Sequence, residues 1–352
     1  MGIRVALVAD AASYNVRDWA RGLVGAGAEV DLVSFVDDPE GELPVHRLSA
    51  PTWAGARARY LAAGPAVRRI MDRIDPDVVV GFYVTGYGTV ARLARRMPLV
   101  EVSVGNDTLV NPPGTMTHLL ARQNLRRARL VVAWAPHIAQ AVAGFGVPDE
   151  RILSLTGGIP LEAYDPARNP LDDPTRLVTT RALDPYYRHD LLIGAVADAP
   201  DLGLRLRFIG TGPIRGELEG QVRSLGLEDR VTFAGSVPSQ VKVDDLYAHG
   251  VYVSACPTDG VSASLLEAMA VGLFPVVVDH VANRSWIVDG ENGYLVDGSQ
   301  AGFVGALRRL TADPTVMVRA RDLNRNLVRD RGDLRTNSTR FVEQFTLLAG
   351  AG

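Results

Sequence analysis

The sequence contains a single cysteine, Cys256, among its 352 residues. A lone thiol excludes an internal disulfide framework and a metal cluster held by several thiolates. Lysine is equally scarce, since Lys242 is the only lysine among the 37 basic residues. The formal net charge is −3, so the chain lacks the overall basic field that holds nucleic acid. We therefore expect no nucleic-acid partner.

Long hydrophobic runs are also missing. The first apolar run, Ile3–Ala9, is far shorter than a membrane span and is followed at once by Asp10, so no targeting signal is expected. It reads as a buried strand, and the chain is expected to be cytoplasmic. Arginines gather near residues 57–73 and 122–129. Solvated helix faces explain them, while a patch for an anionic acceptor or membrane surface is the alternative.

Short apolar runs alternate with longer amphipathic runs along the whole chain. This alternation is typical of parallel sheets covered by helices on both faces. The first half contains the expected strands Ile3–Ala9, Glu29–Ser34, Val78–Phe82, Leu99–Val104 and Leu130–Trp134. The second half repeats the pattern with Leu177–Thr180, Leu204–Ile209, Val231–Ala234, Val251–Ser254 and Phe274–Val278. The sequence therefore predicts an α/β fold of two Rossmann-like, doubly wound parallel-sheet domains facing each other across a cleft.

A proline-rich segment near Tyr164–Thr175 separates the two halves. It holds three prolines and little apolar periodicity, as a linker should. We place an N-terminal domain at residues 1–165 and a C-terminal domain at 166–333. A final helix at 334–352 is expected to pack back toward the N-terminal domain.

The densest signal for chemistry is the segment Cys256–Gly272. A strand ends near Ser254, a loop of small residues follows, and a helix then runs to Gly272. The loop therefore leads from the carboxyl end of a strand into a helix N-terminus, whose free amides bind anions and phosphate above all. Two acids stand eight residues apart here, Asp259 and Glu267. They could hold sugar hydroxyls, or they could be a turn residue and an exposed helix residue.

The surrounding residues carry a resemblance. The run Leu266–Ala270 reads Leu-Glu-Ala-Met-Ala, and further matches flank it in order: Gly157–Pro166, Phe208–Pro213, Leu225–Gly235 and Asn283–Val296, with Val104–Asp107 in the first half. In these segments the chain resembles the family 4 retaining glycosyltransferases of the GT-B fold. The resemblance covers most of the second half and parts of the first.

That resemblance assigns roles to individual residues. Glu267 matches the acid that binds the ribose hydroxyls of the donor, Asp259 the acid near the transferred sugar, and Arg181 the arginine on the diphosphate. These three are the predicted catalytic residues. The predicted donor-binding residues are Arg188, Gly212, Val237, Lys242, Gly260, Val261, Ser262, Ala263 and Ser264. The loop after the first strand and the Gly-Asn-Asp turn supply the predicted acceptor or sugar contacts Ser13, Tyr14, Asn15, Asn106 and Asp107.

Two positions depart from the family pattern. The family usually has glutamate where Asp259 stands, which puts the sugar preference in doubt. The family lysine should follow Arg181 by about six residues, and Tyr187 stands there. Arg188 is the nearest residue that could supply the missing charge.

The resemblance implies a retaining, metal-independent hexosyltransferase. It would use a nucleoside-diphosphate sugar, UDP or GDP, and would glycosylate an acceptor hydroxyl in secondary-metabolite, glycolipid or envelope polysaccharide biosynthesis. It would need no cofactor and no metal, and peripheral membrane contact is expected if the acceptor is a lipid. Two alternatives stay open: a sugar-nucleotide 2-epimerase of related fold, and a non-catalytic partner subunit that binds nucleotide sugar.

Overall fold

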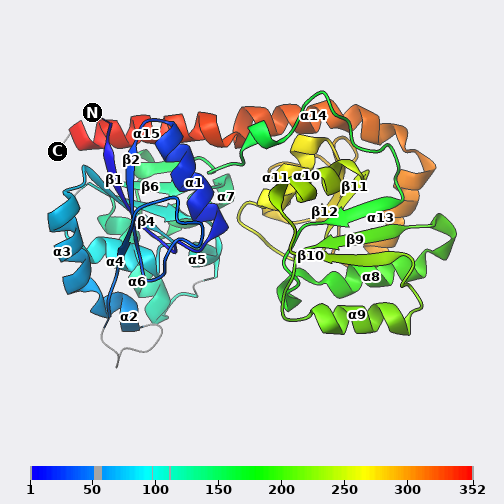
Figure 1. The fold of residues 1–352 in the computed structure, drawn as a ribbon, viewed down its shortest axis with the longest axis horizontal. Coiled ribbons are helices and arrows are strands. Elements are labelled where there is room, and N and C mark those ends of the chain that lie inside the picture. Colours follow the sequence, from blue (N-terminus) through cyan, green and yellow to red (C-terminus); the bar gives the residue numbers. More distant parts are fainter. Residues whose placement is uncertain (1, 51–57, 97, 111, 351–352) are drawn as a thin grey trace. The chain divides into compact units, whose positions relative to one another are not determined.

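The computed structural model of the chain describes residues 2–50, 58–96, 98–110 and 112–350 (Figure 1). For Asn106 only the backbone is described. The chain divides into two compact units, which are Met1–Pro160 with Asp333–Gly352, and Leu161–Gly332. None of the helices in the described ranges combines the length and the apolar character needed to cross a membrane.

The first unit is built on a parallel sheet. In its described residues the sheet has seven strands in the order β3-β2-β1-β4-β5-β6-β7. The strands are β1 (Arg4–Val8), β2 (Glu29–Ser34), β3 (Val45–Arg47), β4 (Val78–Phe82), β5 (Leu99–Ser103), β6 (Leu130–Ala133) and β7 (Ile152–Ser154). The strand order reverses direction between β1 and β4, and such a switch point is where open α/β sheets bind ligands.

Helices cover the sheet of this unit. They are α1 (Tyr14–Gly25), α2 (Ala58–Ala62), α3 (Gly64–Ile74), α4 (Tyr87–Leu93), α5 (Asn106–Leu109), α6 (Met116–Arg127), α7 (Pro136–Gly144) and α15 (Leu334–Gly350). The last helix, α15, packs on α1, where the Trp19 and Phe341 rings meet edge to face with centroids 5.4 Å apart. Gly22 leaves room for this contact, because a Cβ there would lie 2.9 Å from Cδ1 of Leu334.

The amphipathic run Ala54–Arg73 predicts one continuous helix from the sequence, and this prediction is wrong in its described part. Residues 54–57 lie outside the described residues. The rest forms two helices, α2 and α3, with a break at Ala63. Pro65 stands in the first turn of α3, where proline is favoured because its missing N–H has no helical partner.

The second unit repeats the architecture (Figure 1). Its sheet, over the residues that are described, has six parallel strands in the order β10-β9-β8-β11-β12-β13. They are β8 (Arg176–Thr179), β9 (Arg205–Ile209), β10 (Val231–Gly235), β11 (Val251–Ser254), β12 (Phe274–Val278) and β13 (Tyr294–Val296). The helices are α8 (His189–Asp198), α9 (Arg215–Ser224), α10 (Ser239–Tyr247), α11 (Ala263–Val271), α12 (Val281–Arg284), α13 (Gln300–Ala312) and α14 (Thr315–Gly332). The order switches between β8 and β11, which are hydrogen-bonded neighbours.

Candidate functional site

The N-terminus of α11 is built as the sequence predicts. Ser262 is the N-cap, and its Oγ accepts a hydrogen bond from the Leu265 amide at 3.1 Å. At the other end Gly272 adopts a left-handed conformation with φ 93°, the usual conformation of a glycine that terminates a helix. Helix α11 follows β11, so its first turn lies beyond the carboxyl end of that strand, beside the switch point of the sheet.

Arg181 joins this helix N-terminus from the neighbouring strand. It follows the end of β8, and its guanidinium forms an ion pair with Asp259 and donates to Ser262 Oγ at 2.6 Å. The loop is tied to α11 a second time, because Ser264 Oγ donates to the Thr180 carbonyl at 3.2 Å. Arg181, Asp259 and Ser262 therefore meet beyond the carboxyl ends of the strands. In the sequence Arg181 is 78 residues from Asp259 and 81 residues from Ser262.

Two tyrosines, Tyr186 and Tyr187, belong to the loop region around Arg181. The Arg181 guanidinium carbon lies 5.0 Å from the centroid of the Tyr187 ring, which is a cation–π distance. The hydroxyl of Tyr186 donates to the Thr258 carbonyl at 2.9 Å. Burial raises the pKa of both phenols, so they remain neutral hydrogen-bonding groups at physiological pH. Tyr187, which stands at the position of the family lysine, thus contributes an aromatic face.

His189 supports the same loop and was not among the predicted site residues. Its side chain is buried, and its Nε2 lies 2.8 Å from the Ala182 carbonyl oxygen. Burial lowers the pKa of this imidazole, so the neutral ring with a proton on Nε2 donates to that carbonyl. A histidine at the start of α8 gave no sequence signal for this role, since Ala182 is seven residues away.

Glu267 is buried on α11 and has a cationic partner. Its Oε1 lies 2.7 Å from Lys242 Nζ on α10, and the two side chains are 5% and 20% exposed, respectively. The alternative in which Glu267 sits on an exposed helix stripe is therefore wrong. A carboxylate in such an apolar helix requires a partner, and the only lysine of the chain supplies it.

The remaining predicted donor residues occupy three places. Gly260 and Val261 lie with the N-cap Ser262 before α11, Ala263 is the first residue of that helix, and the Gly260 amide donates to Asp259 Oδ1 at 2.8 Å. Gly212 lies against the Leu183 carbonyl so closely that a Cβ would collide with it. Val237 is half-buried just before α10.

Arg188 is held differently from Arg181. Its exposed guanidinium pairs with Asp190, with Nε 3.2 Å from Oδ1. The residue has a positive φ of 50° at the junction between the 3₁₀ turn Pro185–Tyr187 and α8. Within the described residues the Arg188 side chain contacts Asp190 and forms no hydrogen bond or ion pair with Arg181 or Asp259.

The first unit holds a separate cavity of about 650 Å³. The predicted acceptor residue Ser13 lines it, together with three tyrosines, Tyr60, Tyr83 and Tyr87. Tyr14 and Asn15 are exposed at the start of α1. The side chain of Asn106 lies outside the described residues.

Asp107, the last of the predicted acceptor contacts, is buried beneath the turn after β5. Its carboxylate accepts hydrogen bonds from the amides of Val84 at 2.9 Å and Gly105 at 3.1 Å, and from Ser103 Oγ at 3.0 Å. Burial nevertheless raises the pKa of Asp107. In the structure this side chain fixes the loops after β4 and β5 to each other.

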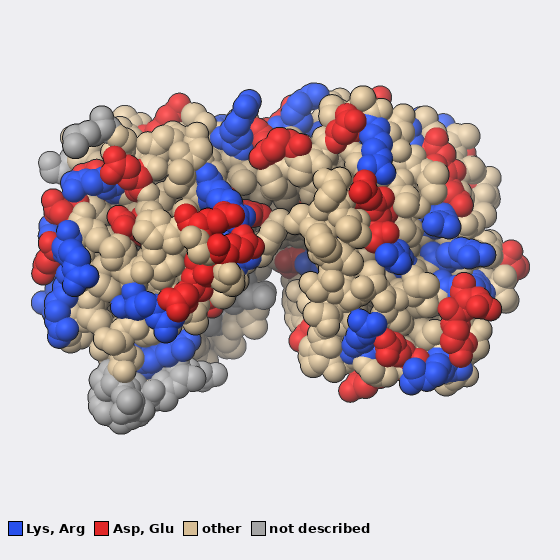
Figure 2. All heavy atoms as spheres, viewed as in Figure 1, with Lys and Arg blue, Asp and Glu red and all other residues tan. Residues whose placement is uncertain are grey.

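Surface charges are mixed. Figure 2 shows basic and acidic side chains interspersed over the face in view. Across the described ranges, no three histidine, cysteine, aspartate or glutamate side chains are grouped so that they could hold a metal ion. Arg181 places a positive charge beside the N-terminus of α11.

Comparisons with known proteins agree with this architecture. Residues 162–327 match the family described as Glycosyl transferases group 1, and residues 4–134 match the family described as Glycosyl transferase 4-like. The chain is 29% identical over 263 residues to the lipopolysaccharide core biosynthesis glycosyltransferase LpsE of Rhizobium meliloti, with 72% of this chain and 71% of that protein covered.

Solved structures show the same fold. A sucrose-phosphate synthase from Thermosynechococcus elongatus superposes with a TM-score of 0.84 at 17% identity, covering 99% of this chain and all of the other. Anabaena HepE in complex with UDP-glucose gives a TM-score of 0.79 at 18% identity, covering 98% of this chain and 100% of HepE. The chain is therefore a glycosyltransferase with the GT-B fold, and its second half belongs to the group 1 family.

Proposed function

We propose that this glycosyltransferase moves a hexose from a UDP-sugar to an acceptor hydroxyl, with retention of configuration at the anomeric carbon. The observation that carries the proposal is the junction of Arg181, Asp259 and Ser262 at the N-terminus of α11. A guanidinium beside a helix N-terminus is a strong site for a diphosphate. The choice of UDP is supported by HepE, whose structure contains UDP-glucose.

The chemistry follows from where the charge develops. As the bond to the sugar breaks, negative charge collects on the departing diphosphate, and the Arg181 cation and the α11 amides stabilise it. These groups are held in place before the reaction, since Ser262, Asp259 and Tyr187 all contact the guanidinium. They supply charge neutralisation without a metal ion. The leaving phosphate would take the proton of the acceptor hydroxyl on the same face of the sugar.

Glu267 would bind the ribose hydroxyls of the donor. A carboxylate accepts hydrogen bonds only. Within the described residues the Oε1 of Glu267 accepts from Lys242 at 2.7 Å, and Oε2 has no hydrogen-bond partner. Lys242 thus orients the carboxylate. Asp259 would be released from Arg181 toward the sugar hydroxyls when a diphosphate takes over the guanidinium.

The acceptor is proposed to bind in the first unit, in the cavity lined by Ser13 and the three tyrosines. Aromatic faces and a few polar groups suit a sugar ring better than a charged ligand. The relatives involved in lipopolysaccharide core biosynthesis favour an envelope glycan or glycolipid as the acceptor class.

A donor panel tests the proposal. The purified chain is incubated with UDP-glucose, UDP-galactose, UDP-GlcNAc and GDP-mannose, each with and without EDTA, and binding is followed by thermal unfolding. A donor at 100 times its Kd should stabilise the fold by about 2.7 kcal/mol, equally in EDTA. Binding of GDP-mannose alone would overturn the choice of UDP, and loss of binding in EDTA would overturn metal independence. Conversion of UDP-GlcNAc to an epimer without acceptor would identify an epimerase instead.

A further inference from the structure

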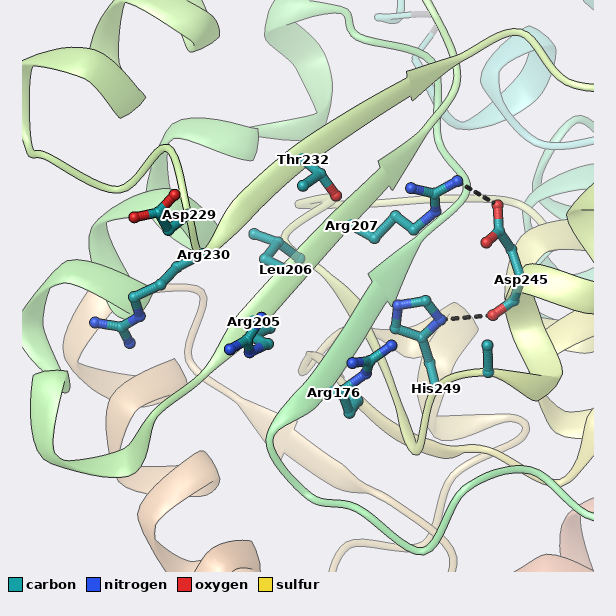
Figure 3. Close-up of a pocket in the computed structure, with 10 residues that line it drawn as sticks. Arg176, Arg205, Leu206, Arg207, Asp229, Arg230, Thr232, Asp245 and His249 are labelled. Carbon is teal, nitrogen blue, oxygen red and sulfur yellow. Dashed lines mark hydrogen bonds and ion pairs between the residues drawn. The ribbon is translucent and has the colours of Figure 1, made fainter.

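Three arginines share one face of the second sheet, away from the site at α11. In the register of β8 and β9, Arg176 stands opposite Arg205, and Val178 stands opposite Arg207. Since side chains alternate along a strand, Arg205 and Arg207 point to the same face as Arg176. The intervening Leu206 is buried in the core on the other face. Figure 3 shows the three arginines beside one another.

Acidic residues of the protein neutralise only part of the positive charge of these three arginines. Like charges directly opposite on neighbouring strands repel each other. Arg207 is paired with Asp245 of α10 at 2.9 Å. Arg176 and Arg205 make no ion pair with any residue that the structure describes, and the Nε of Arg176 is buried without a hydrogen-bond partner. Two guanidinium groups therefore remain available to an anion.

The arginines line a groove of about 350 Å³. Arg230 also borders it, but Figure 3 shows its side chain turned away from the other arginines, and its guanidinium donates to the carbonyls of Leu204 and Val196 at 2.9 and 3.1 Å. Asp229 and the hydroxyl of Thr232 lie at the same groove. The groove thus combines guanidinium donors with a carboxylate that accepts hydrogen bonds and a hydroxyl that can donate or accept them.

We propose that this groove is a second anion site, which binds a small soluble phosphate ester that carries hydroxyl groups. Paired guanidinium groups match the oxygens of a phosphate, and Asp229 and Thr232 are placed to take the hydroxyls. A hollow of this size encloses a small molecule, whereas a membrane surface would meet a flat or convex patch.

The groove is distinct from the donor site of the same unit. Arg176 begins β8, whereas Arg181 follows its carboxyl end. Five residues of extended chain separate their backbones by roughly 16 Å. Arg181, Asp259 and Ser262 are not among the residues that line the groove, so the two sites can be inactivated one at a time.

Titration calorimetry of the full chain with glycerol 3-phosphate tests this site, with glycerol as the uncharged control. The titration is run in the R181A background, so that the donor site does not contribute. We expect saturable binding of glycerol 3-phosphate, none of glycerol, and a loss of about tenfold or more in affinity on R176A or R205A. Arg205 is exposed, so R205A should fold even if R176A does not. R223A, at an exposed position on α9, is the matched control and should bind as its parent does.

Three results would overturn the site: no binding of glycerol 3-phosphate, binding that R205A leaves unchanged, or binding present in the wild type and absent from R181A. Sedimentation with phosphatidylglycerol vesicles tests whether the groove binds the phosphate of a lipid headgroup and not that of a soluble ester. Vesicle binding that R205A abolishes, without binding of the soluble ester, would show that the groove recognises a lipid headgroup and would contradict the proposal.

Discussion

Lys242 Nζ lies 2.7 Å from Glu267 Oε1, and the pair joins α10 to α11 in a largely buried position. The only lysine of the chain thus neutralises the acid of the Leu-Glu-Ala-Met-Ala run. Removal of one member leaves the other charge without its partner in a poorly solvated place, which costs more than the intact pair contributes.

Lys242→Met is therefore expected to lower the free energy of unfolding by about 3 kcal/mol. The double variant Lys242→Met/Glu267→Gln should recover much of this stability, because it buries no unpaired charge. Donor affinity should be lower than that of the wild type in both variants, because Lys242→Met removes the group that orients Glu267 and the double variant also removes the carboxylate proposed to bind the ribose. Urea unfolding and donor titration measure the two effects separately.

Arg284→Ala is the control for this pair, because Arg284 forms an exposed ion pair with Asp279 and such pairs contribute little. Equal loss of stability in Arg284→Ala and Lys242→Met would contradict the importance of burial. Full donor affinity in the double variant would remove Glu267 from the donor site.

Tyr187 tests the aromatic face beneath Arg181. Tyr187→Phe keeps the ring and should leave kcat/KM near the wild-type value, while Tyr187→Ala should lower it by about tenfold, the range of a partly desolvated cation–π contact. Steady-state kinetics with a UDP-sugar measure both. A large loss in Tyr187→Phe would show instead that the phenol hydroxyl is the functional group.

Glu101 makes stability depend on pH. This carboxyl is fully buried on β5, neither oxygen has a hydrogen-bond partner in the described residues, and burial raises its pKa well above the ordinary value. The folded state then holds a proton that the unfolded state releases above pH ~4.3. Its contribution to stability is thus present at low pH and is lost as the pH rises toward the folded pKa, by up to about 1.4 kcal/mol per pH unit.

Glu101→Gln should remove this dependence and stabilise the fold at pH 8 more than at pH 5. Thermal unfolding across that range measures it, and Glu150→Gln, at an exposed position, is the matched loss of a carboxylate. A parallel shift of the Glu101→Gln and wild-type curves at every pH would mean that Glu101 is ionised in the fold.

The Cys256 thiol should react slowly with alkylating reagents in the folded protein. Its thiol is buried, donates to the Thr258 carbonyl at 3.0 Å, and has its pKa raised by burial to about 11. Because the thiolate is the nucleophile, iodoacetamide at pH 8 should modify the native protein far more slowly than the urea-unfolded protein. Mass spectrometry follows the adduct, and equal rates in the two states would contradict the burial of this thiol.

The inner strands could be read from the sequence, because they are continuous apolar runs of four to six residues. The strands Val251–Ser254 and Phe274–Val278 have the predicted bounds. In the described residues, the edge strands β3, β7 and β13 have three residues each, which is too short for a periodic pattern, and they were not predicted. The fourth edge strand, β10, has five residues and was predicted. The break at Ala63 was not predicted, because Pro65 is compatible with the first turn of a new helix and does not by itself show where the preceding helix ends.

The site was predictable only in its local part. The strand, the loop and the capped helix around Asp259 and Glu267 form one continuous segment. Their partners come from elsewhere: Arg181 is 78 residues from Asp259, and Lys242 is 25 from Glu267. The adjacency of β8 and β11 decides the first contact, and tertiary packing of α10 on α11 decides the second, so neither could be read from local spacing.

Arg181 carries the central claim, and a comparison of two ligands tests it most directly. UDP and uridine differ by the diphosphate alone, so titration of both into the wild type and Arg181→Ala isolates that contact. We expect the variant to bind UDP about 100-fold more weakly, as loss of a charge-assisted bidentate contact implies, and to bind uridine as the wild type does. Equal affinity of both proteins for UDP would contradict a diphosphate site at Arg181 and the N-terminus of α11.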